Sequence, residues 1–159
     1  DLDVEETGSN YLENARLKAV AAACRTGCWA LADDSGLEVD ALDGAPGLFT
    51  ARFAASDHDK LERLQAAMAD IPYRSACFRS AMVLCSPEGS CEEESEGFCW
   101  GELLHIPAYP GGGIESLFWV REAGCSYGQL NASQLSRLGS RGKAARSLAP
   151  GLRRRLQLD

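Results

Sequence analysis

Two adjacent aspartates, Asp33 and Asp34, follow the short apolar run at 30–32, and a Ser-Gly pair comes directly after them. Neighbouring ionised carboxylates repel each other, and burial at the end of a strand would add several kcal/mol to that cost. A bound cation or a proton-transfer task would compensate. Magnesium prefers one or two carboxylates and completes its shell with water and substrate phosphates. From this pair alone, a structural role in capping a turn is the simpler interpretation.

The elements that must position these acids can be predicted from the local pattern. Asn10, three residues before Glu13, resembles a capping box and predicts a helix that runs to about Cys24. Short apolar or alternating runs predict strands over 28–32 and 37–42, with the two aspartates at the turn between them. Two further acids, at positions 5 and 6, stand before the first helix and could fold back beside Asp34.

The rest of the chain mixes helical and strand patterns, with hairpins in the middle. The pattern predicts a helix over 57–69, strands over 75–85, 98–104 and 114–120, and a helical segment over 131–156 that is interrupted near Gly139 and at Pro150-Gly151. No repeat or linker divides the sequence. We therefore expect a single α/β domain over residues 1–159.

Composition excludes several classes of function. The chain has 159 residues, 45% hydrophobic and 25% charged, and a formal net charge of −7, which argues against binding to nucleic acid polymers or anionic membranes. Its seven cysteines include no C-x-x-C motif and only two histidines accompany them, so a structural zinc site is not expected. Reduced thiols in the cytoplasm fit this pattern best. No apolar run approaches the length of a membrane span.

Four blocks in this order and spacing resemble the inosine triphosphate pyrophosphatase family, whose members clear non-standard purine nucleoside triphosphates. The blocks are Glu5–Gly8, Glu13–Ala15 with Lys18-Ala19, Ala30–Leu42 and Gly44–Ala54. Weaker similarity continues at Arg74-x-Ala76-x-Phe78, at Gly101–Leu103 and at Ser140–Ala144, so that the resemblance covers about 3–148. One such motif would be weak support, whereas four linked blocks are specific.

The resemblance implies an elongated α/β fold in which a mixed sheet flanked by helices forms two lobes, with a nucleotide cleft between the lobes. It also implies hydrolysis of a nucleoside triphosphate between the α and β phosphates, releasing a nucleoside monophosphate and pyrophosphate. Mg²⁺ (or Mn²⁺) would be the metal, the substrate would be a nucleoside triphosphate or a related phosphorylated small molecule, and a homodimer is expected. This implied reaction agrees with the carboxylate chemistry, because attack on a polyanion needs charge neutralisation and an oriented water.

Positions carried over from the family assign roles to individual residues. Asp34 would accept the proton of the attacking water and would also bind the metal, with Glu5 as the second carboxylate ligand. The expected substrate contacts are Ser35, Gly113, Glu115, Ser140 and Arg141.

The sequence departs from the family at the phosphate-binding end. The family begins with a strand, a Thr/Ser-Gly-Asn turn and a lysine that together cradle the phosphates, whereas this sequence starts at Asp1, after that point. We therefore expect a chain that is N-terminally truncated relative to the family, either because it is a fragment or because it does without this segment.

The sequence also departs from the family where the base would bind. Gly112 and Ile114 stand where the family has two aromatic residues, and Leu135 and Gly139 stand where it has a lysine and a histidine. Lost stacking predicts an altered base preference. Two alternatives stay open: a degenerate relative that acts as a binding module without turnover, and an enzyme for a related phosphorylated substrate.

Overall fold

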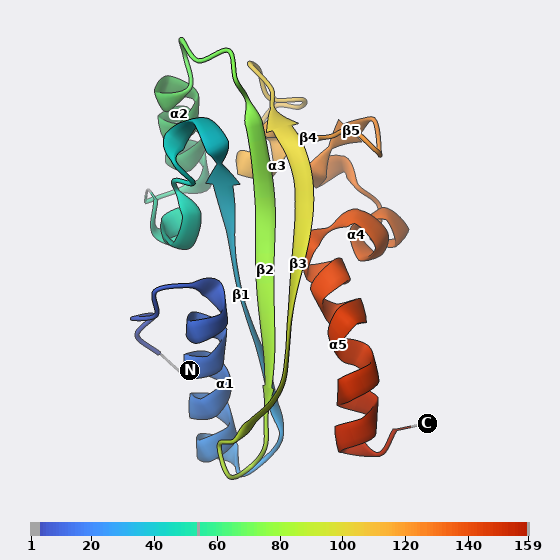
Figure 1. Cartoon of the computed structure of the whole chain (residues 1–159). Helices are drawn as coiled ribbons and strands as arrows, with labels where there is room; N and C mark the ends of the chain where they lie inside the picture. Colours follow the sequence, from blue (N-terminus) through green and yellow to red (C-terminus); the bar gives the residue numbers. More distant parts are fainter. Residues whose placement is uncertain (1–3, 54, 159) are drawn as a thin grey trace. The chain divides into compact units, whose positions relative to one another are not determined.

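The structure is a computed structural model of the chain, and it describes residues 4–53 and 55–158 (Figure 1). The described residues form two compact units. Unit 1 lies within Asp1–Ser35, Arg79–Phe98 and Ser140–Asp159, and unit 2 consists of Gly36–Phe78 and Cys99–Gly139. Three long strands contribute residues to both units.

The strands form one five-stranded sheet in the order β1-β2-β3-β4-β5. Consecutive strands are neighbours, and the sheet is antiparallel: Glu102 of β3 lies opposite Trp119 of β4, and Val120 of β4 lies opposite Cys125 of β5. The elements are α1 (Tyr11–Thr26), β1 (Ala30–Val39), α2 (Asp57–Ala67), β2 (Ser75–Cys85), β3 (Cys91–Leu103), α3 (Ile114–Leu117), β4 (Phe118–Val120), β5 (Cys125–Ser126), α4 (Ala132–Leu138) and α5 (Ser140–Leu156). The predicted α/β class is confirmed.

Helix α1 begins and ends where the sequence predicts. The Oδ1 atom of Asn10 accepts a hydrogen bond from the Glu13 backbone N–H at 2.9 Å, and Gly27 ends the helix with a φ of 64°. The Glu13 carboxylate reaches one residue further back than a standard capping box requires, since it accepts from the Ser9 backbone N–H at 2.7 Å. These caps fix the helix that carries part of the candidate site.

The prediction of a turn at Ser35-Gly36 is wrong, because β1 runs without interruption from Ala30 to Val39. The second predicted strand ends early, and 40–42 form a short 3₁₀ turn. Successive side chains of a strand point to opposite faces. Asp33 and Asp34 therefore lie on opposite faces of β1 rather than together at a turn.

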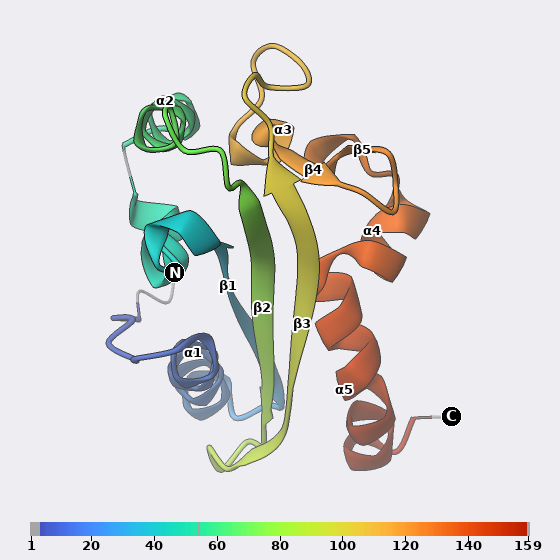
Figure 2. The same ribbon diagram turned by 45° about the horizontal axis from the view of Figure 1, so that its top comes forward.

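In unit 1, α1 and α5 lie on opposite faces of the strands (Figures 1 and 2). Small side chains let both helices approach closely: Ala15 and Ala19 of α1 are fully buried, as is Ala144 of α5. A Cβ atom at Gly97 of β3 would overlap the Ser140 carbonyl oxygen and the Ala144 backbone nitrogen, so glycine is required for this contact.

Unit 2 contains a hydrophobic core built around the paired ends of the strands. Phe78, Phe118 and Tyr127 pack with ring centroids 4.7–6.1 Å apart. The Arg74 guanidinium donates to backbone carbonyls of two segments, through Nε to Leu103 at 2.6 Å and through its other nitrogens to Leu104 and Met68. One half-buried cation thus ties the start of β2 to the end of β3 and the end of α2.

Three further expectations need correction. Residues 114–120 form the short helix α3 followed by β4, instead of one strand. β3 begins at Cys91 and is longer than predicted, so the acidic run 91–96 lies within it. The predicted break at Gly139 is present, but α5 continues through Pro150-Gly151. Within the described residues, no helix combines the length and the hydrophobicity needed to cross a bilayer.

Candidate functional site in unit 1

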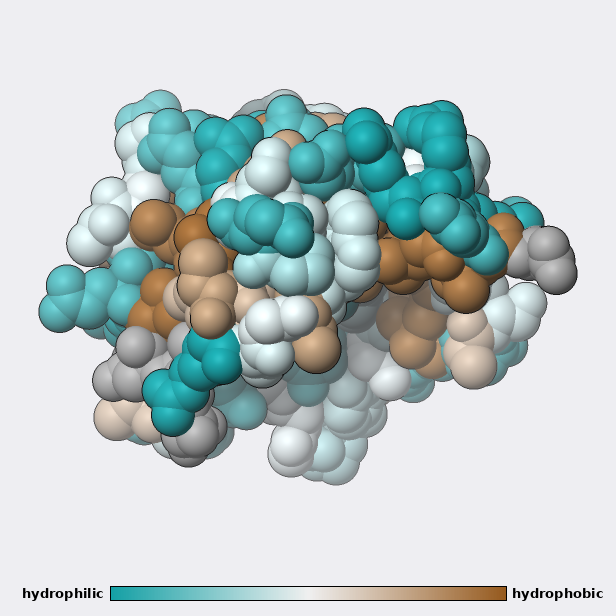
Figure 3. All heavy atoms as spheres, turned by 90° about the horizontal axis from the view of Figure 1, so that it is seen from below, coloured by the Kyte–Doolittle hydropathy of each residue, from teal (hydrophilic) through white to brown (hydrophobic). Residues whose placement is uncertain are grey.

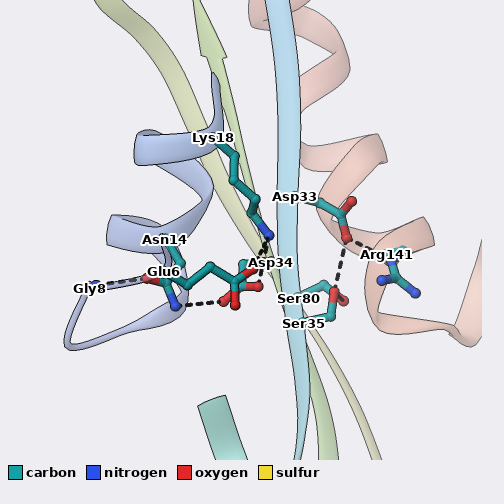
Figure 4. Close-up of polar contacts among 9 residues, drawn as sticks. All are labelled: Glu6, Gly8, Asn14, Lys18, Asp33, Asp34, Ser35, Ser80 and Arg141. Atoms are coloured by element: carbon teal, nitrogen blue, oxygen red, sulfur yellow. Dashed lines mark hydrogen bonds and ion pairs between the residues drawn. The ribbon is translucent and has the colours of Figure 1, made fainter. Parts of the chain in front are cut away.

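Asp34 lies buried beneath α1, and two side chains of that helix hold its carboxylate (Figure 4). Lys18 Nζ contacts Asp34 Oδ1 at 2.9 Å, and Asn14 Nδ2 donates to Asp34 Oδ2 at 3.2 Å. Asn14 and Lys18 are four residues apart, so they project from the same face of the helix. Only 9% of the surface of Asp34 is exposed, and each of its oxygens has a donor.

Glu6 adds a second carboxylate to this group. Glu6 Oε1 contacts Lys18 Nζ at 3.2 Å, so that one ammonium bridges the carboxylates of Glu6 and Asp34. The segment before α1 is fixed by the Gly8 backbone N–H, which donates to Asn14 Oδ1 at 2.8 Å. A Cβ atom at Gly8 would lie 2.6 Å from that oxygen, so only glycine fits there. The predicted ligand Glu5 is exposed instead.

The charge state of Lys18 follows from these contacts. Burial disfavours the ammonium, but hydrogen bonds and charge interactions with Asp34 and then Glu6 outweigh it, and the pKa of Lys18 is raised above its ordinary value. Lys18 is therefore charged at any physiological pH. Two carboxylates share this one ammonium in a mostly buried cluster, an arrangement that favours a further cation.

Asp33 occupies the opposite face of β1 and has different partners. Its Oδ2 accepts from Arg141 Nε at 2.7 Å and from Ser35 Oγ at 3.1 Å. The Arg141 side chain at the start of α5 is 65% exposed, and that of Asp33 is 36% exposed. Unlike the Asp34 contacts, this ion pair is open to solvent.

A chain of hydroxyl groups connects β1 to the start of α5 on this face. Ser35 Oγ lies 2.9 Å from Ser80 Oγ, which lies 2.8 Å from Ser140 Oγ. Ser80 on β2 is completely buried and Ser140 nearly so. The chain fixes the position of the residue directly before Arg141. Ser35, Ser140 and Arg141, three of the predicted substrate contacts, are thus brought together through Ser80, a residue that no sequence pattern singled out.

The remaining predicted substrate contacts belong to unit 2. The Gly113 backbone N–H donates to Glu115 Oε1 at 2.9 Å at the start of α3. The ring of Tyr109 covers Gly112, where a Cβ atom would lie 2.5 Å from Tyr109 Cε2. Burial and the charge of Glu115 raise the pKa of this phenol. Tyr109 thus places an aromatic ring beside one of the two positions at which the family's aromatics are missing.

The segment 106–113 borders a cavity of about 830 Å³ in unit 2, whose other wall is α2. Ile114 itself is buried in the core of the unit. Ile114, which stands where the family has an aromatic residue, therefore contributes to packing.

The donor set around Asp34 can be tested against a metal ion. Residues 4–53 and 55–158 contain no group of three or more His, Cys, Asp or Glu side chains placed to hold one. Two carboxylates that converge on one ammonium are hard oxygen donors, and Mg²⁺ typically takes only one or two carboxylates and fills its shell with water and phosphate oxygens. Asp34 and Glu6 fit that requirement.

Residues that prediction missed fall into two kinds. Asn14 and Lys18 stand in the block at 13–19 that resembles the family, and their spacing of four places them on one helix face, a signal that could have been used. Ser80 has no comparable signal, because one serine in an apolar strand predicts nothing by itself.

The sequence profile of the Ham1 family matches residues 1–151. The chain belongs to the Ham1 family. The predicted relationship to the pyrophosphatases that clear non-standard purine nucleotides is thereby confirmed.

Curated Ham1 relatives are similar over nearly the whole chain. A protein of Gloeobacter violaceus called dITP/XTP pyrophosphatase is 45% identical over 155 residues, which cover 97% of this chain and 79% of the relative. A protein of Synechocystis with the same name is 39% identical over 157 residues, covering 96% and 81%. These relatives are hydrolases that act on acid anhydrides, the class predicted for this chain.

Solved Ham1 structures show the same fold. The Ham1 protein of Staphylococcus aureus is 35% identical with a TM-score of 0.85, and the match covers 96% of this chain and 81% of that chain. The HAM1 protein of Coxiella burnetii is 35% identical with a TM-score of 0.86, covering 95% and 80%. The fold predicted from the four sequence blocks is the fold of this family.

Proposed function

We propose that the chain hydrolyses a nucleoside triphosphate to a nucleoside monophosphate and pyrophosphate, with Asp34 at the reaction centre. The observation that carries this proposal is the buried Asp34 carboxylate, which α1 holds by Lys18 and Asn14 and which shares the Lys18 ammonium with Glu6. Two carboxylates around one ammonium cost stability when they are mostly buried. Such clusters of charged groups are therefore more common at functional sites than elsewhere in a protein. The names of the curated Ham1 relatives support the same reaction.

Each residue of the group has a role in this reaction. A bound divalent cation, Mg²⁺ or Mn²⁺, would supply charge neutralisation on the triphosphate, and Asp34 and Glu6 would hold it. The Asp34 carboxylate accepts the proton of the attacking water, and Asn14 orients that carboxylate through its second oxygen. Lys18 bridges the two carboxylates and adds positive charge where phosphate oxygens bind.

The opposite face supplies predicted contacts with the substrate. Arg141 presents an exposed guanidinium, which suits a phosphate or a base carbonyl. Ser35 and Ser140 hold their positions through the buried hydroxyl of Ser80.

We propose an altered base preference within the class of non-standard purine nucleoside triphosphates. Gly112 and Ile114 replace the family's aromatics, and Leu135 and Gly139 replace its lysine and histidine. Tyr109, which covers Gly112, offers a ring from a different chain position. A ring that stacks from another direction selects bases by shape more than by hydrogen bonds.

Pyrophosphate release from a panel of purine triphosphates with Mg²⁺ tests the reaction. We expect Asp34→Asn to lower kcat by about 10²–10⁴-fold, because it removes the proton acceptor. Asp33→Asn is the matched control: it makes the same chemical change one residue away on the other face, and we expect it to keep most of the activity. Release by Asp34→Asn at the wild-type rate would refute the assignment. Nucleotide binding without release by the wild type would favour the binding-module alternative.

We also propose that the chain forms a homodimer through unit 2. Trp100 and Tyr73 are 62% and 59% exposed and flank a cavity of about 690 Å³ that also contains the Arg121–Glu102 ion pair. A surface with exposed aromatics and both charges can be self-complementary across a two-fold axis. Light scattering should give a dimer for the wild type and a monomer for Trp100→Glu. Phe49→Glu, at a similarly exposed ring, should stay dimeric; a dimeric Trp100→Glu contradicts the proposal.

A further inference from the structure

The turn between β2 and β3 fixes the register of the strands on either side of it. The Ser86 backbone N–H donates to the Ser90 carbonyl at 2.8 Å, and the Gly89 backbone N–H donates to the Ser86 carbonyl at 2.8 Å. Gly89 has a φ of 82°, so the connection is a three-residue loop that ends in a left-handed glycine. Ser86 and Ser90 are therefore the first hydrogen-bonded pair of the hairpin.

Cys85 and Cys91 form the next pair outward. In an antiparallel ladder, hydrogen-bonded and non-hydrogen-bonded pairs alternate, so these two cysteines are a non-hydrogen-bonded pair, in which side chains lie closest. The Cα separation typical of such a pair, about 4.5 Å, falls at the short end of the range that disulfides span, about 4.4–6.8 Å. Burial and a hydrogen bond with the Cys91 thiol raise the pKa of the Cys85 thiol to about 12.

A third thiol reaches the same turn from α1. A Cβ atom at Gly89 would lie 3.0 Å from Cys24 Sγ, so the thiol of Cys24 packs directly on the turn. Cys24 is exposed, Cys91 is half-buried and Cys85 is buried. Figure 3 views this end of the molecule, where hydrophobic and hydrophilic residues both reach the surface.

Positive charge accompanies the thiols. The Arg16 guanidinium, which pairs with Glu94 at 2.8 Å, is close enough for charge interactions with both Cys85 and Cys91. A nearby cation favours the thiolate, the form that reacts with oxidants.

We propose that Cys85 and Cys91 form a redox modification site, joined by a reversible disulfide under peroxide, with Cys24 as the neighbouring thiol through which that disulfide exchanges. The site lies in unit 1 and does not depend on the proposed hydrolysis. None of its three cysteines contacts Asp34, so modification is expected to change stability and not turnover.

The chemistry balances with hydrogen peroxide as the oxidant. The Cys91 thiolate attacks one peroxide oxygen, the O–O bond breaks, and with one proton taken up the products are Cys91 sulfenic acid and water. The Cys85 sulfur then attacks the sulfenic sulfur, its proton and the hydroxide leave as a second water, and the S–S bond forms. Two thiols lose two electrons, and one peroxide becomes two waters. A thiol reductant reverses the step through attack on the disulfide.

The site can be tested on the intact chain by peptide mapping. The protein is treated with peroxide, the remaining thiols are blocked with N-ethylmaleimide in denaturant, and the chain is cut after glutamate. Cleavage after Glu88, inside the turn, and after Glu92 separates the two cysteines, so that residues 63–88 and 89–92 stay together only through a disulfide. We expect this linked pair, and we expect dithiothreitol to separate it.

Serine variants identify which cysteines form the disulfide. Cys77 is the other cysteine of the 63–88 peptide, and Cys77→Ser should keep the linkage, whereas Cys85→Ser and Cys91→Ser should each abolish it. Because Cys85 is buried, the Cys85→Ser variant can fail to fold. The decisive variant is therefore Cys91→Ser, at a half-buried position. Cys24→Ser should keep the linkage but slow its reduction.

A second readout is thermal. Closing a loop of this size should raise the Tm of the oxidised wild type by about 5 °C, reversibly, and leave that of Cys91→Ser unchanged. A wild type in which all seven thiols remain reactive after peroxide overturns the proposal. A peptide linking 89–92 to 14–38, the fragment that contains Cys24, with no linkage of 89–92 to 63–88, overturns the assigned pair.

Discussion

Asp33 and Asp34 are chemically identical neighbours, but the two faces of β1 in unit 1 place them in opposite environments. Asp34 is 9% exposed and is held by a lysine and an amide from one helix, with a second acid beside it. Asp33 faces the other helix, where an exposed arginine and a serine are its partners. The strand alternation that separates them also separates the proposed site for proton transfer and metal binding from the proposed contacts with substrate. Adjacent residues in a motif therefore need not share a role.

The first test of this comparison neutralises Glu6, the second acid on the Asp34 face. Glu6→Gln should lower kcat/KM by about 100-fold and raise the Mg²⁺ concentration needed for half-maximal rate, because it removes a carboxylate that shares Lys18 with Asp34. Glu5→Gln is the matched control and should behave like the wild type, since Glu5 is exposed. Steady-state kinetics over a Mg²⁺ series decide between them. If Glu5→Gln is the damaging change, the assignment implied by the family resemblance is right and the one based on geometry is wrong.

A second test removes the cation between the acids. Lys18→Met leaves two mostly buried carboxylates without their partner and should lower the free energy of unfolding by about 2–3 kcal/mol at neutral pH. Mg²⁺ should restore part of this loss, because a metal ion can take the ammonium's place. Urea unfolding with and without Mg²⁺ measures both effects.

The pH dependence of that difference has a defined sign. The folded state raises the pKa of Lys18, so its contribution to stability is fully present below the unfolded value of about 10.4 and is lost as the pH rises through the folded value. The gap between wild type and Lys18→Met should therefore be constant around neutrality and shrink above pH ~10.4. A gap that shrinks between pH 6 and 8 would show that another group controls it.

On the Asp33 face, the buried hydroxyl chain is expected to matter more than the ion pair. Ser80→Ala leaves Ser35 and Ser140 each without one partner and should cost about 1–2 kcal/mol of unfolding free energy. We expect KM to rise with kcat nearly unchanged, because Ser80 positions the segment before Arg141 without touching the reacting atoms. Ser80→Cys has a similar volume and a weaker donor, so its stability and its KM should lie between those of the wild type and Ser80→Ala. An effect on kcat alone would contradict a positioning role.

The smallest effect is expected for the exposed ion pair. A double-mutant cycle of Asp33→Asn and Arg141→Gln should give a coupling energy below about 1 kcal/mol, and salt should reduce it further. The corresponding cycle of Asp34→Asn and Lys18→Met should give a larger value with little dependence on salt. Equal coupling energies on the two faces would remove the distinction drawn between them.

Much of the architecture could be predicted because local signals agreed with the fold. Asn10, Glu13 and Gly27 fix the ends of α1 by hydrogen bonds within a few residues, which sequence spacing alone determines. β2 has the predicted bounds, since its mostly apolar residues have no competing turn signal. The Asp-Asp-Ser-Gly segment shows the opposite case. Its residues locally favour a turn, but pairing with β2 keeps it extended.

By itself, the sequence determined the family and the caps of α1, and it singled out Asp34 as the candidate central acid, because each depends on residue types at short or fixed spacing. Only the tertiary structure decided that Glu6 and not Glu5 joins Lys18, that Ser80 connects Ser35 with Ser140, and that Tyr109 covers Gly112. These contacts join segments that are up to 60 residues apart along the chain. Their partners are selected by which face of a strand or helix each side chain occupies, and that depends on pairing and packing that no local pattern specifies.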